Sequence, residues 1–492
     1  MGTSEVISTS RGSPPLAVML CTALLCACAT VPRKPAPPVL FANVAPSGFP
    51  QTVRFLGLDR GFMLAHAGET LSRLREAAHG ETLNILALSG GGAGGAFGTG
   101  ALVGLTRRGD RPQFQIVTGV SVGALIAPFA FLGPEWDQAM VEALGPDRTA
   151  RLLQSRGLGV LFRPGAYRSE PLVELVDHLV SRRLIEAVAT EAARGKVLFV
   201  ATTDLDKQEA VIWDMGAIAA HGGEAARVLF RDVLVASASV PGLFPPVLIR
   251  VDGPDGESFD EMHVDGGTAT PFFVASEIAQ ILSADFEVLP GAEVLHGARV
   301  YVLVNGELGG RPQTTRERPV VIITRSFSAG LMHSSRRALE LSAVFARQHQ
   351  MDFHFSYVPL NYPFAGPFNF KAPVMQTLFD YGLRCAEAGQ LWMTFEQAVE
   401  QGEKAARSVL KQSNDCPLAQ AAPCQLDRTA AASGPRSSDD LQHRVELTAF
   451  ECGARRWGMP WARREHASRA AAGRANPHGR PEMEVPPRPP RR

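Results

Sequence analysis

A run of glycines between an apolar segment and a helical pattern constrains the fold of this 492-residue chain most strongly. Residues 83–88 are mostly apolar and of strand length, and seven glycines follow between Gly90 and Gly100. Glycine destabilises a helix interior by roughly 1 kcal/mol relative to alanine, so glycines placed where a helix begins indicate a backbone requirement. The stretch predicts a tight turn from a buried strand into a helix, where the backbone approaches another group closely.

Free backbone N–H groups make such a turn an anion site, because the first turn of a helix has no internal acceptors for them. Three kinds of anion are candidates for this site. A nucleotide phosphate under a Walker loop needs a lysine that this run lacks. A dinucleotide fits Gly90, Gly92 and Gly95, but the acid at the usual distance, Asp110, precedes the next predicted strand instead of ending it. The third anion is the transient oxyanion of an acyl-transfer reaction.

The second predicted strand favours the oxyanion. Residues 114–120 run directly into Gly119-Val120-Ser121-Val122-Gly123, and a helical pattern follows. A G-x-S-x-G between strand and helix is the context of a nucleophile elbow, in which a sharp turn projects the serine above the sheet. Gly119 and Gly123 leave room for that turn. Two neighbouring parallel strands would bring both turns to the same sheet edge.

A serine hydroxyl is a weak nucleophile and needs a general base. The candidate is Asp265, which ends an apolar-rich run and is followed by Gly266 and Gly267. The alternative is an ordinary turn in which the aspartate side chain caps the backbone.

Strand-like runs alternate with helical patterns over the body of the chain, which predicts βαβ units. We therefore expect a three-layer αβα domain with a mostly parallel central sheet. An apolar fraction of 45% suffices for a sizeable core. The net charge of zero argues against a nucleic-acid partner.

Taken together, the glycine run, Gly119-x-Ser121-x-Gly123 and Asp265-Gly266-Gly267 resemble, in order and spacing, the patatin-like phospholipases; residues 236–247 resemble another stretch of that family. The resemblance covers about Leu83 to Leu391. It implies a patatin-like fold and a serine acyl hydrolase, phospholipase A-like or lysophospholipase-like, that acts on acyl lipids. We expect no cofactor. Ser121 would be the nucleophile and Asp265 the proton acceptor. The implied oxyanion hole consists of Gly90, Gly91, Gly92 and Gly95.

Two positions depart from the family pattern. Gly94 stands where many members carry an arginine or lysine, and the residues after Gly267 do not form the usual Asn-x-Pro run. Two other functions stay open. One is an esterase with a Ser-His-Asp triad, whose histidine would be His296, His333, His349 or His354. The other is a non-catalytic lipid-binding lipoprotein.

The N-terminus has the features of an export signal. Residues 16–29 are apolar and too short to span a bilayer. Leu25 to Cys28 resemble the lipobox of bacterial lipoproteins, which would make Cys28 the lipidated residue; a plain signal peptide is the alternative. We expect an exported bacterial lipoprotein, anchored to a membrane and facing the periplasm or cell envelope.

The remaining organisation follows from composition. We expect a signal peptide over 1–28, a spacer and N-terminal extension over 29–80, a catalytic domain over 81–400, a helical extension over 401–424 and a disordered tail over 425–492. An exported chain is able to form disulfides. Cys385, Cys416, Cys424 and Cys452 allow three pairings, of which Cys416 with Cys424 is the most local prediction; the alternative is that all four are free. Asp204 and Asp206 lack further ligands nearby in sequence, so no metal is predicted. The aromatic segment 357–370 is expected to pack on the sheet edge, with a lipid-facing loop as the alternative.

Overall fold

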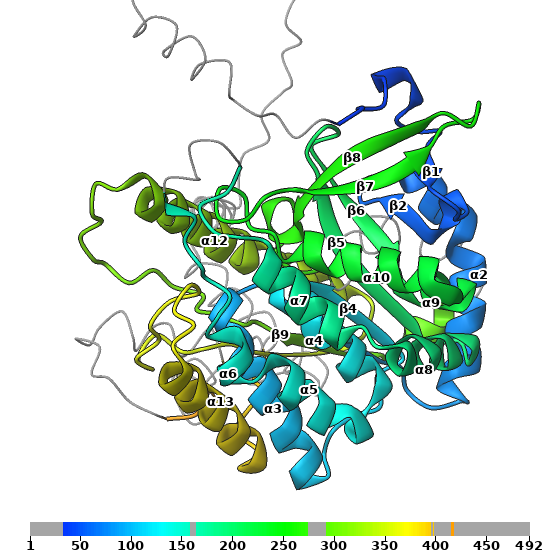
Figure 1. Cartoon of the computed structure of the whole chain (residues 1–492). Coiled ribbons are helices and arrows are strands. Elements are labelled where there is room, and N and C mark those ends of the chain that lie inside the picture. Colours follow the sequence, from blue (N-terminus) through cyan, green and yellow to red (C-terminus); the bar gives the residue numbers. More distant parts are fainter. Residues whose placement is uncertain (1–32, 158–163, 274–291, 395–396, 398–414, 418–492) are drawn as a thin grey trace, which may run out of the picture. The chain divides into compact units, whose positions relative to one another are not determined.

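The computed structural model describes residues 33–157, 164–273, 292–394, 397 and 415–417 (Figure 1). The predicted signal peptide with Cys28, nearly all of the helical extension, and the tail with Cys424 and Cys452 lie outside these residues. The chain divides into two units, residues 1–395 with 410–420 and residues 396–409 with 421–492. The fold below is that of the first unit.

Ten strands of the described residues form one mixed sheet in the order β1-β7-β8-β5-β4-β3-β9-β10, with β6 beside β5 and β2 beside β6. Strands β5, β4, β3, β9 and β10 are consecutive and parallel, with β10 at one edge of the sheet, while the other strands join antiparallel. Their bounds are β1 (Ala45–Pro46), β2 (Arg54–Leu56), β3 (Asn84–Leu88), β4 (Ile116–Val120), β5 (Val197–Asp204), β6 (Glu209–Asp214), β7 (Val247–Asp252), β8 (Ser258–Asp265), β9 (Arg299–Leu303) and β10 (Asp352–Ser356).

Helices cover both faces of the sheet, which confirms the three-layer α/β architecture. Because side chains alternate along a strand, Leu86 and Val117 join the main core on one face, while Ile85 and Ile116 face a cavity of about 330 Å³ under α2 and α12. Figure 1 shows α3, α4, α7 and α10 together in front of the sheet. No helix among the described residues has the length and apolar character that crossing a bilayer requires. The helices are α2 (Arg60–Ala78), α3 (Gly95–Arg108), α4 (Val122–Leu132), α5 (Asp137–Leu144), α6 (Pro146–Thr149), α7 (Glu170–Leu179), α8 (Arg182–Ala193), α9 (Met215–His221), α10 (Gly223–Ser237), α12 (Pro319–Gln348) and α13 (Ala372–Glu387).

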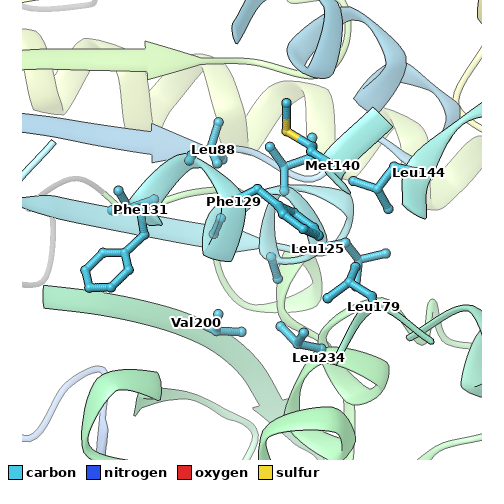
Figure 2. Packing of buried hydrophobic residues seen from close by; sticks show 14 of the residues in the cluster. Leu88, Leu125, Phe129, Phe131, Met140, Leu144, Leu179, Val200 and Leu234 are labelled. Atoms are coloured by element: carbon cyan, nitrogen blue, oxygen red, sulfur yellow. The ribbon is translucent and has the colours of Figure 1, made fainter. Parts of the chain in front are cut away.

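Helix α4, which follows the predicted nucleophile, is buried over its whole length from Gly123 to Leu132. A helix that is apolar on all sides requires burial on all sides. Figure 2 shows Leu125 and Phe129 of α4 among side chains from the sheet and from the surrounding helices. This packing fixes the start of α4, and with it the turn that precedes the helix.

Residues 33–80 are integrated into the domain, which differs from the expected spacer. Strand β1 pairs with β7, β2 pairs with β6, and Arg33 forms an ion pair of 2.7 Å with Asp206. The buried guanidinium of Arg54 binds the carboxylate of Glu261 in β8. These contacts join residues that are far apart in sequence, so local composition did not reveal them.

The predicted local pairing of Cys416 with Cys424 is wrong. Cys416 forms a disulfide with Cys385 of α13, with 5.3 Å between the Cα atoms. The hydroxyl of Tyr381 on the same helix donates a hydrogen bond of 2.8 Å to the carbonyl of Asp415. The chain therefore returns to α13 after residue 397, and proximity in the fold decides the pairing over proximity in sequence.

Candidate active site

Ser121 occupies a strained turn between β4 and α4, as the elbow pattern predicts. Its φ is 56° and its ψ is −127°, a conformation that costs a non-glycine residue of order 1–3 kcal/mol. Gly123 is required next to it, because a Cβ there would lie 2.3 Å from the carbonyl oxygen of Leu88. The strain and the close packing of β3 hold the serine oxygen in one position.

The hydroxyl of Ser121 donates a hydrogen bond of 2.6 Å to Oδ2 of Asp265. Strand pairing explains the contact. Val120 pairs with Ala201 of β5, so Ser121 follows at the level of Thr202, and the antiparallel partner of Thr202 on β8 is Asp265. β4 and β8 pair with consecutive residues along one edge of β5, while β6 pairs with the other edge, so the two strand ends bring the side chains of Ser121 and Asp265 together. The geometry suits proton transfer from the serine to the carboxylate.

Burial shifts the pKa of the Asp265 carboxylate toward the range that suits a general base. The residue is fully buried, and desolvation raises its pKa to about 7, although the hydrogen bonds from Ser121 and from the N–H of Gly267 act in the opposite direction. A general base works best when its pKa lies near the operating pH. Gly266 follows with its Cα packed against the Ala201 carbonyl, which leaves no room for a side chain.

The glycine loop lies against the serine. A Cβ on Gly90 would be 3.2 Å from Cβ of Ser121. Gly91 has a φ of 155°, and a Cβ there would lie 1.8 Å from the carbonyl oxygen of Asn305. The side chain of Asn305 donates to the carbonyl of Ser89 (2.7 Å), and its N–H donates to the hydroxyl of Ser89 (2.8 Å). Asn305, which sequence reasoning missed, therefore braces the loop.

The N–H groups of the loop differ in what they bind. Gly90 donates to the carbonyl of Pro271 (3.1 Å), and Gly95 donates within the short 3-10 turn that precedes α3. Among the hydrogen bonds of the described residues, the N–H groups of Gly91 and Gly92 have no acceptor. Of the four glycines predicted for an oxyanion hole, these two are the available donors.

Ser237, at the end of α10, connects the turn at Ser121 to β5 through two hydrogen bonds. Its hydroxyl accepts a hydrogen bond of 2.9 Å from the N–H of Ser121 and donates one of 2.7 Å to the carbonyl of Ala201. Sequence analysis singled out residues 236–247 but gave Ser237 no role. A serine inside a helix carries no local signal of a partner more than a hundred residues away.

An apolar cavity of about 60 Å³ opens beside Ser121. Phe368 and Phe370 of the aromatic segment 357–370 line it, whereas Tyr362 packs on Tyr381 of α13 with 4.4 Å between ring centroids. The segment therefore both packs on the domain and lines the cavity. The other lining residues are almost all aliphatic or aromatic, among them Leu125, Leu144, Leu152, Leu172, Val240, Phe244 and Met375.

None of the four candidate triad histidines hydrogen-bonds to Ser121 or Asp265 in the described part of the chain. His333 is exposed on α12, and His349 caps the far end of that helix. His354 stacks on Tyr301 with 5.3 Å between ring centroids, and His296 precedes β9. In a Ser-His-Asp triad the carboxylate contacts the histidine. Here the carboxylate of Asp265 contacts the hydroxyl of Ser121 directly.

Asp204, Glu261 and His263 form a buried cluster whose ligand atoms lie within 4.8 Å of one another. The ammonium of Lys207 lies 2.9 Å from the carboxylate of Asp204 and also binds Glu261. Although burial acts to raise it, the pKa of Glu261 is lowered by the hydrogen bond from His263 and by the guanidinium of Arg54, which binds the same carboxylate. Because side-chain cations already occupy these carboxylates, the cluster is an ion-pair network and not a vacant metal site.

The family match agrees with the resemblance found in the sequence. Residues 86–276 match the family described as patatin-like phospholipase, which confirms it. Among solved structures, the chain is similar to VipD from Legionella pneumophila, with 12% identity, a TM-score of 0.32, and coverage of 80% of this chain and 77% of that one. No curated protein matches the chain.

Proposed function

Since residues 86–276 belong to the patatin-like phospholipase family, we propose that the chain hydrolyses carboxylic ester bonds of acyl lipids through Ser121 and Asp265. Membership supports lipid acyl hydrolase chemistry in general. The 2.6 Å hydrogen bond between Ser121 and the raised-pKa carboxylate of Asp265 carries the assignment of the residues.

The proposed reaction has two steps. Oγ of Ser121 attacks the ester carbonyl carbon, and its proton passes to Oδ2 of Asp265. The tetrahedral intermediate collapses as the ester C–O bond breaks, and Asp265 returns the proton to the leaving alcohol. Water then attacks the acyl-enzyme and gives a proton to Asp265, which passes it back to Ser121 as the fatty acid leaves.

The N–H groups of Gly91 and Gly92 would stabilise the oxyanion in both steps. Removing one such donor typically costs about 3 kcal/mol of transition-state stabilisation. The apolar cavity beside Ser121 would receive the acyl chain. We propose glycerophospholipids or lysophospholipids as the substrate class, with phospholipase A or lysophospholipase activity.

The test is hydrolysis of phospholipid and lysophospholipid by the purified full chain, with Ser121→Ala and Asp265→Ala as site variants. Asp260→Ala is the matched control, because Asp260 lies on the same strand outside the site. We expect loss of activity in both site variants only. A fluorophosphonate probe should label the wild type and not Ser121→Ala. A folded wild type that neither reacts with the probe nor releases fatty acid would support the non-catalytic alternative, and collapse of activity on replacing one of the four histidines would support a triad.

We further propose that Cys28 is lipidated and anchors the domain to a bacterial membrane facing the periplasm or cell envelope. The support is the lipobox-like Leu25-Cys26-Ala27-Cys28. Metabolic labelling with an alkyne fatty acid should mark the wild type and not Cys28→Ser. Equal labelling of both would refute the anchor.

A further inference from the structure

The first turn of α12 exposes apolar side chains. Pro319 to Ile323 are five consecutive apolar residues, and Val320, Ile322 and Ile323 are 36%, 48% and 43% exposed. They are three of the seven large hydrophobic side chains most exposed among the described residues. Consecutive exposed apolar residues are unfavourable in water unless they serve a function, and clustered ones mark interaction sites.

The same helix leads from this turn to Ser121. Val320, Ile323, Phe327 and Leu331 recur at helical spacing and so share one face. Gly242 lies between Val240 and Phe244, two residues that line the apolar cavity beside Ser121. The side chain of Ile323 is so close to Gly242 that a Cβ placed on this glycine would lie 3.1 Å from it. A Cβ placed on Gly267 would lie 3.2 Å from the side chain of Leu331, and one placed on Gly90 would lie 3.8 Å from it. From Ile323 to Leu331 the helix rises about 12 Å, so the exposed turn begins a short apolar path to the glycine loop.

Positive charge surrounds the exposed turn. Residues 316–325 contain three arginines, Arg316, Arg318 and Arg325, and one acid, Glu317. Arg316 and Arg318 are exposed just before the helix, and Arg325 is partly buried two residues after Ile323. Within the described part of the chain, these three arginines form no ion pair.

We propose that residues 316–325, the α12 docking surface, bind an anionic lipid surface and present its lipids to Ser121. The inference rests on the proposed function. Apolar side chains flanked by arginines are the composition of segments that lie in a bilayer interface, and each basic residue near anionic lipid adds about fivefold to binding. A second copy of the chain is a poorer occupant. Three side chains cover far less than the roughly 800 Å² per partner of a stable interface, and a two-fold contact would oppose like charges.

The test measures binding apart from catalysis. The full chain carrying Cys28→Ser and Ser121→Ala, which lacks both the anchor and the nucleophile, is sedimented with vesicles of phosphatidylcholine alone or mixed with phosphatidylglycerol. We expect binding to the mixed vesicles that weakens with salt. Val320→Glu with Ile322→Glu should weaken it at least about tenfold, and Arg316→Gln with Arg318→Gln about 25-fold on mixed vesicles only. Leu58→Glu, at a residue 71% exposed and outside this surface, is the matched control.

Activity provides the second readout, now with Ser121 intact. Val320→Glu with Ile322→Glu should lose hydrolysis of vesicle lipid and retain hydrolysis of p-nitrophenyl butyrate, a soluble ester. Equal vesicle binding by this variant and by Leu58→Glu would overturn the docking surface, even if lipid is hydrolysed. A change of oligomeric state in the variant without vesicles would overturn it in favour of self-association. Because binding is read on the Ser121→Ala chain, absence of all hydrolysis would refute the proposed function alone.

Discussion

Oγ of Ser121 and Oδ2 of Asp265 lie 2.6 Å apart, although 144 positions separate the two residues in the sequence. The sheet produces this contact: β4 runs parallel to β5, β8 runs antiparallel to it, and the two side chains meet above Thr202. A direct hydrogen bond leaves no place for a third residue between the two side chains. The predictions below follow from this arrangement and from the contacts that support it.

The activity should depend on pH through Asp265. Its pKa is raised to about 7, and only the ionised carboxylate accepts the serine proton. We therefore expect kcat/KM for a soluble ester to fall about tenfold per pH unit below pH 7 and to level off above it. Glu307 also has a pKa raised to about 7 by burial, so Glu307→Gln is the matched control and should leave the profile unchanged. A profile flat down to pH 5 would contradict Asp265 as the base.

The same burial should make Asp265 destabilising at high pH. Its folded pKa lies above the ordinary 3.8, so the native state holds the proton more tightly than the unfolded state, and stability falls as pH rises from about 4 to 7. Asp265→Asn should therefore raise the free energy of unfolding at pH 8 by roughly 1–4 kcal/mol and change it little at pH 4. Denaturant unfolding at both pH values checks this. A loss of stability at pH 8 would show that the buried charge is compensated.

The sequence predicts the turns that carry the site residues better than it predicts the residues that hold these turns in place. The glycine run, the elbow and Asp265 each stand at the end of a local pattern, so their turns could be placed before the fold was known. Ser237 and Asn305 could not be assigned a role, because each acts through one hydrogen-bonding contact with residues far away in sequence. Likewise, no local signal announced that residues 33–80 would add strands to the sheet.

The glycine run itself has two uses, of which sequence reasoning saw one. Gly91 and Gly92 shape the loop beside Ser121, but Gly100, one turn into α3, serves helix packing. A Cβ on Gly100 would lie 2.1 Å from the carbonyl oxygen of Phe379 in α13. The two uses look alike in sequence because glycine marks any close approach of backbones, whichever partner approaches.

Ser237→Ala should impair catalysis without removing a reacting group. The buried N–H of Ser121 would lose its acceptor, and an unsatisfied buried donor costs about 1–3 kcal/mol. We expect kcat for a soluble ester and the rate of fluorophosphonate labelling to fall about tenfold, with the pH profile unchanged. Ser239→Ala is the control, because among the described residues the hydroxyl of Ser239 donates to the carbonyl of Val235 and to no atom of the site. Equal effects of the two changes would mean that Ser237 does not position the nucleophile.

Gly91→Ala should abolish activity, because its Cβ would collide with the Asn305 carbonyl and displace the loop. Gly256→Ala separates this clash from backbone strain, since Gly256 also has a positive φ, 75°, but open space around it. We expect Gly256→Ala to lower stability by about 1 kcal/mol and to keep full activity. Retained ester hydrolysis in a folded Gly91→Ala chain would exclude the loop from the oxyanion hole.

The disulfide between Cys385 and Cys416 should stabilise the domain, because it closes a loop and so restricts the unfolded chain. The two residues are 31 positions apart, and in the chain-entropy description a loop of that length contributes about 3–4 kcal/mol. Cys385→Ser with Cys416→Ser should lower the free energy of unfolding by up to that amount. Activity should be retained at low temperature, because Met375, the residue of α13 that lines the cavity, lies ten positions from Cys385, and α13 stays packed on α3. Peptide mapping without reductant checks the pairing: a peptide that joins Cys416 to Cys424 would overturn it, and full stability in the double variant would show that the bond does not constrain the unfolded chain.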